Sequence, residues 1–157
     1  MKTTGRNRVA AATLSVAALL SLAWPSDVGA QEADVKAAID ASQAAIHARD
    51  VGAIAKVWSH GADVTLVNPG DKTVAVGWDA VRGRWEAVFT ILSGVDIKQT
   101  DGPYITVTDT IAHAVGIVHV GLRFKSQEAR EADFVETDVL RKQDGRWLVV
   151  SHTAKPL

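Results

Sequence analysis

"ETDVLRKQDGRWLVVSHTAKP", residues 136–156, consists of two strand-like segments joined by a tight turn. The turn contains the pair Asp144-Gly145, and this pair tolerates the positive φ angles that a two-residue hairpin loop requires. The segment before the turn extends back to residue 133 and, like the segment after it, alternates in the manner of a strand. We therefore expect an antiparallel hairpin at the C-terminal end of the domain.

Two further long strands are predicted before this hairpin. The segment IAHAVGIVHVGLRFK, residues 111–125, has the length and composition of a strand. The segments VDIKQ (95–99) and YITVT (104–108) are interpreted as one strand that bends at DGP (101–103), because Gly and Pro interrupt a ladder without necessarily ending it. Residues after Gly94 thus predict a run of antiparallel strands.

The residues before Gly94 mainly show helical spacing. A first helix is predicted over 33–48, a second begins after Asp50 as its cap, and a third follows Asp79 as its cap. Between the second and third helices, residues 63–67 alternate like a strand and 68–71 form a turn. The apolar stripe of the first helix consists of Val35, Ile39, Ser42 and Ile46, and that of the third consists of Val81, Trp85, Val88, Phe89 and Leu92. Helices followed by antiparallel strands predict an α+β domain with the helices on one face of a curved sheet.

The N-terminal residues 1–30 have the pattern of a secretory signal peptide. Lys2, Arg6 and Arg8 precede an apolar run at 9–24, and small residues at 28–30 follow a polar break. We expect cleavage after residue 30, a secreted or periplasmic protein, and no membrane attachment after cleavage. An uncleaved membrane anchor is the alternative, but the apolar run is short for a membrane span.

Composition excludes several classes of function. The chain has no cysteine, which rules out disulfides, a thiol nucleophile and cysteine ligands for a metal. Its formal net charge is −1, and no basic cluster stands out, which argues against a nucleic-acid partner. Dinucleotide-binding and phosphate-binding loops have no match in spacing, so no cofactor is predicted.

The order of these elements resembles the nuclear transport factor 2-like superfamily, in its SnoaL-like branch. The resemblance rests on VGWDAVRGRWEAVF (76–89) and on the closing segment 136–156, and it spans about residues 33–155. It implies a SnoaL-like domain over 31–157 with a cone-shaped fold, in which three helices and a curved antiparallel sheet enclose a deep pocket. It also implies a homodimer through the outer face of the sheet. No single activity follows, because the superfamily mixes isomerases, cyclases, dehydratases, binding proteins and scaffolds.

The set of residues used by ketosteroid isomerases is incomplete in this chain. That chemistry needs a carboxylate base, and a tyrosine together with a protonated acid to hold the enolate oxygen. Tyr104 is the only tyrosine, and it lies in the bent strand. Asp63 can supply the base, but the matching oxyanion donors are missing, so no isomerase site is assigned.

Several aromatic and polar residues are candidates for the pocket wall. Trp58, Trp85 and Phe89 lie on helical stripes, which are more often core than ligand contacts, but in a cone-shaped fold the same stripe lines the cavity. Thr137 and Trp147 lie on neighbouring strands and are assigned to the pocket by parity alone.

Histidines and one aspartate complete the candidates. His119 on the long strand is a possible ligand contact. A metal site built from His119 and His113 would need a third ligand such as His152. No metal is predicted, because strand histidines lie at an interface more often than they bind a metal. His60 and Asp63 flank the corner between the second helix and the first strand. They are either local turn chemistry or a catalytic pair.

Three hypotheses for function remain. The favoured one is a secreted binding module whose Trp-lined pocket holds a small hydrophobic or aromatic molecule, because no complete catalytic set can be assembled. The second is an enzyme doing general acid–base chemistry on a small carbonyl compound, with Asp63 or His60 as the base. The third is a homo-oligomeric scaffold with a vestigial cavity.

Overall fold

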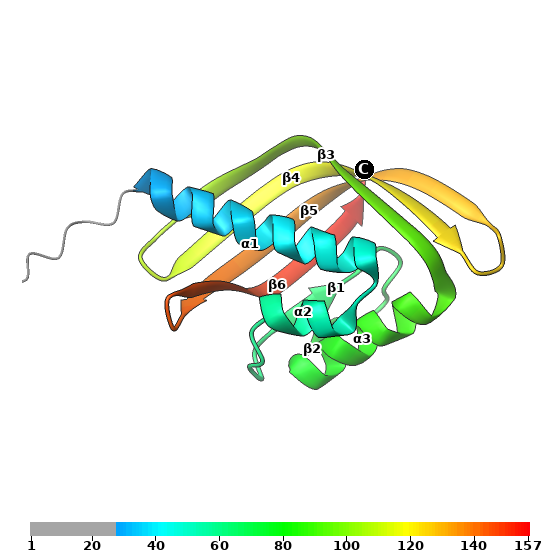
Figure 1. The fold of residues 1–157 in the computed structure, drawn as a ribbon, viewed down its shortest axis with the longest axis horizontal. Helices are drawn as coiled ribbons and strands as arrows, with labels where there is room; N and C mark the ends of the chain where they lie inside the picture. Colours follow the sequence, from blue (N-terminus) through cyan, green and yellow to red (C-terminus); the bar gives the residue numbers. More distant parts are fainter. Residues whose placement is uncertain (1–27) are drawn as a thin grey trace, which may run out of the picture.

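The computed structural model describes residues 28–157, which form three helices and one six-stranded sheet (Figure 1). The predicted leader lies outside the described residues except for its last three, 28–30. The helices are α1 (Val28–Ala48), α2 (Val51–Val57) and α3 (Trp78–Ile91). The strands are β1 (Thr65–Val67), β2 (Ala75–Val76), β3 (Leu92–Val107), β4 (Ile111–Phe124), β5 (Ala129–Gln143) and β6 (Arg146–Pro156).

The sheet has the strand order β2-β1-β6-β5-β4-β3 and is curved (Figure 1). Neighbouring strands are antiparallel except for β1, which runs parallel to β6. In β3 the register shifts between Gln99 and Asp101 and again between Asp101 and Tyr104, so the predicted bend within one continuous strand is confirmed.

The β5–β6 hairpin forms at the predicted turn. Asp144 has φ 49° and Gly145 has φ 77°, and Gln143 pairs with Arg146 across the loop. Positive φ at both central residues is what a two-residue loop needs to match the twist of its strands. This turn fixes the register from which the rest of the hairpin is counted.

Gly145→Ala should destabilise the protein by about 1–2 kcal/mol, because a side chain at positive φ is sterically unfavourable. Gly83→Ala is the matched control, since Gly83 lies in α3 without positive φ and an added Cβ meets nothing within 4 Å at either position. The control should be neutral or stabilise by up to about 1 kcal/mol. Denaturant unfolding measures both; equal effects would contradict the turn assignment.

The first two helices show the predicted cap and buried stripe, but α1 begins at Val28, five residues before the predicted start at 33. Asp50 is the N-cap of α2 and accepts a hydrogen bond from the Ala53 amide at 3.1 Å. The predicted stripe of α1 is buried throughout: Val35, Ile39, Ser42 and Ile46.

The third helix begins two residues earlier than predicted. Its N-cap is Gly77 at φ 84°, and Asp79 lies in the first turn rather than at the cap. Val81, Trp85 and Phe89 are buried, whereas Leu92 already belongs to β3.

The helices and the sheet enclose the core on one face of the sheet. On β4, Ala112, Ala114 and Val118 are buried, whereas His113 and His119 alternate with them and point to the other face. Among residues 28–157 no helix has the length and apolar character of a membrane span. The homodimer through the outer face stays a prediction.

Candidate functional site

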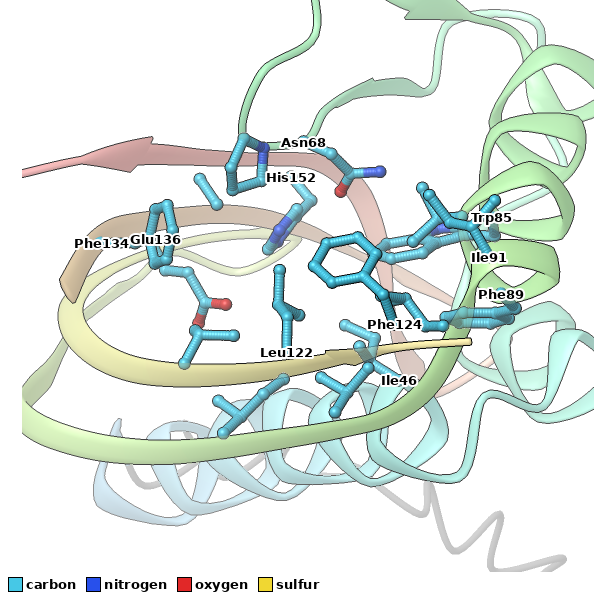
Figure 2. Close-up of a pocket in the computed structure, with 17 residues that line it drawn as sticks. Ile46, Asn68, Trp85, Phe89, Ile91, Leu122, Phe124, Phe134, Glu136 and His152 are labelled. Carbon is cyan, nitrogen blue, oxygen red and sulfur yellow. The ribbon is translucent and has the colours of Figure 1, made fainter. Parts of the chain in front are cut away.

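A cavity of about 190 Å³ lies between α3, the end of α1 and the inner face of the sheet (Figure 2). Its walls are mainly apolar and come from α3 and from all four long strands. Prominent among them are Trp85, Phe89, Leu122, Phe124 and Phe134.

Polar side chains reach this apolar space from the β5–β6 hairpin. Asp138 lies directly opposite His152, and Glu136 lies opposite Ala154, two residues further along the same face. Glu136 and His152 line the cavity (Figure 2), and Asp138 is hydrogen-bonded to His152. The exposed fractions of Glu136, Asp138 and His152 are only 8%, 7% and 6%. Three ionisable groups are therefore held together away from bulk water.

Hydrogen bonds fix these three side chains. His152 Nδ1 lies 2.8 Å from Asp138 Oδ1, and since a carboxylate only accepts, the imidazole donates there through Nδ1. Gln43 on α1 donates from Nε2 to Glu136 Oε2 at 3.1 Å. Asp138 thus orients the ring of His152 and leaves Nε2 for another partner.

The environment moves the pKa values of His152 and Glu136 upward. Burial alone lowers the pKa of His152, but the charge of Asp138, its hydrogen bond and the charge of Glu136 outweigh burial and raise that pKa to about 9. Burial is the main reason why the pKa of Glu136 is raised, and the charge of Asp138 adds to it, while His152 and Gln43 act against it. At neutral pH the site therefore holds a cationic donor beside a carboxyl group whose proton affinity is increased.

Two of the predicted pocket residues line this cavity. Trp85 and Phe89 stack with ring centroids 5.5 Å apart on its wall, as their stripe on α3 indicated. Trp58 and Trp147 are buried in the core but do not line the cavity, which corrects their assignment. Trp58 ends α2 and bridges to Val149, and Trp147 lies near the turn of the hairpin, far along β6 from His152.

Thr137 and His119 lie on the opposite face of the sheet, so their assignment to the pocket is wrong. Thr137 stands between Glu136 and Asp138, which both point inward, so the period of two turns Thr137 outward. His119 Nδ1 lies 2.8 Å from Asp133 Oδ1, in a charged groove on the outer face. The faces of these two residues were assigned without knowledge of the strand register, and that is why the assignment was wrong.

The predicted catalytic candidates Asp63 and His60 do not reach the cavity either. Asp63 forms an ion pair with Arg141 at 2.7 Å, and the hydrogen bond of this pair is the main reason why the pKa of Asp63 is lowered. The His60 ring stacks on Trp78 at 4.2 Å and lies 2.8 Å from the Ala55 carbonyl. The contacts of both residues are therefore local to the exposed corner between α2 and β1, as the turn interpretation of the sequence expected.

Sequence reasoning missed the acid–base group of the hairpin. The pattern Glu-x-Asp on β5 was visible, but placing His152 opposite Asp138 needs the exact register of β6. Within the described part of the chain, no group of three or more His, Cys, Asp and Glu side chains is placed to hold a metal ion.

Three helices closing a curved six-stranded sheet over an apolar cavity with ionisable groups define a pocket-containing α+β domain of the nuclear transport factor 2-like fold. The sequence pattern of the SnoaL-like domain matches residues 35–154. The chain therefore belongs to the SnoaL-like domain family, within the nuclear transport factor 2-like superfamily. No curated protein matches it.

Solved structures share this fold at low sequence identity. A putative dehydratase of the same superfamily from Streptomyces avermitilis is 19% identical with a TM-score of 0.74, over 82% of this chain and 98% of that one. A ketosteroid isomerase-like protein from Erwinia carotovora atroseptica is 20% identical with a TM-score of 0.70, over 80% and 95%. A hexachlorocyclohexane dehydrochlorinase from Novosphingobium barchaimii is 14% identical with a TM-score of 0.68, over 81% and 86%.

Proposed function

We propose that the protein is an enzyme that transfers a proton on a small, mainly apolar molecule. Glu136 is the base and His152 is the acid. The observation that carries this proposal is the buried pair itself: a carboxyl group and an imidazole face the same apolar cavity. Perturbed ionisable groups in a cavity are typical of proton-transfer sites.

Each group has a defined part in the reaction. Glu136, as carboxylate, takes a proton from a carbon beside a carbonyl group, and the electron pair of that C–H bond moves towards the carbonyl oxygen. His152 Nε2 donates a hydrogen bond or its proton to the oxygen as negative charge develops. Asp138 is a positioning residue, because its carboxylate accepts a hydrogen bond from the imidazole and it does not itself line the cavity.

Chemistry named for the structural neighbours supports this proposal. Dehydration and dehydrochlorination each remove a proton and a leaving group from adjacent atoms, and isomerisation of a ketone begins with removal of a proton beside the carbonyl. All three need a base, and a donor assists the two in which negative charge develops on oxygen, dehydration and isomerisation. This chain offers both, at positions that its own hairpin register defines.

Exchange of substrate protons for deuterium tests the proposal without knowledge of the product. The protein is incubated in deuterium oxide with acetophenone, cyclohexenone or phenylacetaldehyde, and loss of the proton signal beside the carbonyl is followed by NMR. We expect at least one compound to exchange about 100-fold faster than with free imidazole at equal concentration. Exchange no faster than with imidazole for all three would contradict an enzyme of this class.

A binding module without turnover is the second candidate. It is favoured by the protonation of His152 at neutral pH, which makes this residue a fixed cationic donor in an apolar pocket. Saturable binding of these compounds without any exchange would support it. The scaffold hypothesis is disfavoured, because the cavity is open space rather than a volume filled by the protein's own side chains.

A further inference from the structure

Asn68 has a buried amide group without a partner at the edge of the cavity. It follows β1, in which Leu66 pairs with His152, so the period of two places Asn68 on the same inner face (Figure 2). Only 8% of Asn68 is exposed, and its Nδ2 donates no hydrogen bond. A buried donor left unpaired costs about 1–3 kcal/mol, so a reason for its position is needed.

The backbone of Asn68 is held firmly. Its amide donates to Asp71 Oδ2 at 2.8 Å, and the Asp71 amide donates to the Asn68 carbonyl at 3.0 Å. Arg84 on α3 forms an ion pair with the other oxygen of Asp71. The turn, and with it the backbone of Asn68, is thus tied to the helix that carries Trp85.

Trp85, which lines the cavity, carries a second unpaired donor. Its indole Nε1 is buried without a partner, and its ring centroid lies 6.2 Å from that of His152. The indoles of Trp58 and Trp147 are also unpaired, but they lie in the core away from the cavity. What distinguishes Trp85 is therefore its place beside His152 on the lining, which it shares with Asn68.

We propose that Asn68 Nδ2 and Trp85 Nε1 donate hydrogen bonds to a carbonyl oxygen of the substrate, and that the substrate is a single-ring carbonyl compound. This rests on the proposed function and extends it to a substrate class. Both groups only donate, so the ligand atom that they recognise must be an acceptor. With His152 they form the donor side of the cavity, and Glu136 forms the side that receives the proton.

The size of the cavity limits the ligand to about one ring. An apolar cavity of about 150 Å³ binds benzene, and most pockets for larger ligands occupy about 300–1,000 Å³. The volume of about 190 Å³ therefore fits a six-membered ring with a short carbonyl substituent and leaves no room for several fused rings.

Two probes of equal shape test the proposal by calorimetric titration. Acetophenone carries the carbonyl oxygen, and isopropenylbenzene replaces that oxygen with a methylene group. The wild-type protein should bind acetophenone about 10-fold tighter or more, because the apolar probe leaves both donors unpaired. Asn68→Leu and Asn68→Asp, which remove the donor at nearly constant size, should each reduce this preference to less than about threefold. Trp85→Phe should reduce it in part.

Trp58→Phe is the matched control, since it removes an equally buried and unpaired indole N–H that does not line the cavity. It should leave the preference unchanged. The proposal would be overturned if the wild-type protein bound both probes equally well, or if acetophenone showed no saturable binding below about 10 mM. It would also be overturned if the Asn68 variants and the Trp85 variant all kept the wild-type preference for acetophenone. These results concern binding only, whereas the proposed function fails on the exchange experiment, so the two failures are distinguishable.

Discussion

Glu136→Gln should reduce the rate of proton exchange by about 100- to 10,000-fold while substrate binding changes by less than about threefold. Glutamine keeps the size of the side chain and its contact with Gln43, but it cannot take a proton from carbon. The variant thus removes the base and leaves the cavity in place. NMR exchange in deuterium oxide gives the rate, and calorimetric titration with acetophenone gives the affinity.

Asp63→Asn is the control for this experiment. Asp63 is a carboxylate suggested by the sequence alone, but it is bound to Arg141 outside the cavity, so its exchange rate should equal that of the wild type. A Glu136→Gln variant with the exchange rate of the wild type would show that Glu136 is not the base. An inactive Asp63→Asn variant with an intact fold would return the candidate site to the corner between α2 and β1.

The free energy of unfolding should fall by about 3 kcal/mol as the pH rises from about 5.5 to 9.5, because His152 is protonated more strongly in the folded state. Its pKa is raised from 6.5 to about 9, so its contribution is complete below pH 6.5 and is lost as the pH passes 9. The raised pKa of Glu136 also lowers the free energy of unfolding as the pH rises, and this loss begins near pH 4.5, the ordinary pKa of a glutamate. Urea unfolding at a series of pH values measures the effect.

The double variant Asp138→Asn/His152→Gln should lose most of this pH dependence, because it removes both charges of the buried pair together. Removal of only one partner is avoided, since an uncompensated buried charge is itself strongly destabilising. His47→Gln is the control, because the His47 side chain is 61% exposed. Wild-type stability that does not change between pH 6.5 and 9 would show that His152 is not a buried cation.

The local pattern of the sequence was sufficient for most elements. The spacing of Val35, Ile39 and Ile46 fixed the buried face of α1, because only one face of a helix can meet the sheet. The Asp144-Gly145 pair located the hairpin, because few residues accept two successive positive φ angles. Trp85 and Phe89 could be predicted as cavity residues from the apolar stripe of α3, because the same stripe packs in the core and lines the cavity.

The inner face of the hairpin depends on a bulge that the sequence did not indicate. Counted from the turn, Leu140 pairs with Val149, but Val139 pairs with Ser151, so Val150 is an extra residue in β6. Without this bulge His152 would lie opposite Thr137 and point to the outer face. The single extra residue turns His152 inward, opposite Asp138.

By itself, the sequence indicated the family by resemblance. It also determined the α+β fold, the order of the helices and the place of the hairpin, because these follow from contacts between residues close in the chain or from short repeating patterns. Only the tertiary structure decided which side chains share the cavity. Register across β5 and β6, the approach of Asn68 from β1 and the burial that raises the pKa of Glu136 all depend on segments distant in sequence. Such long-range placement has no local signature, since a shift of one residue reverses the face of every side chain that follows.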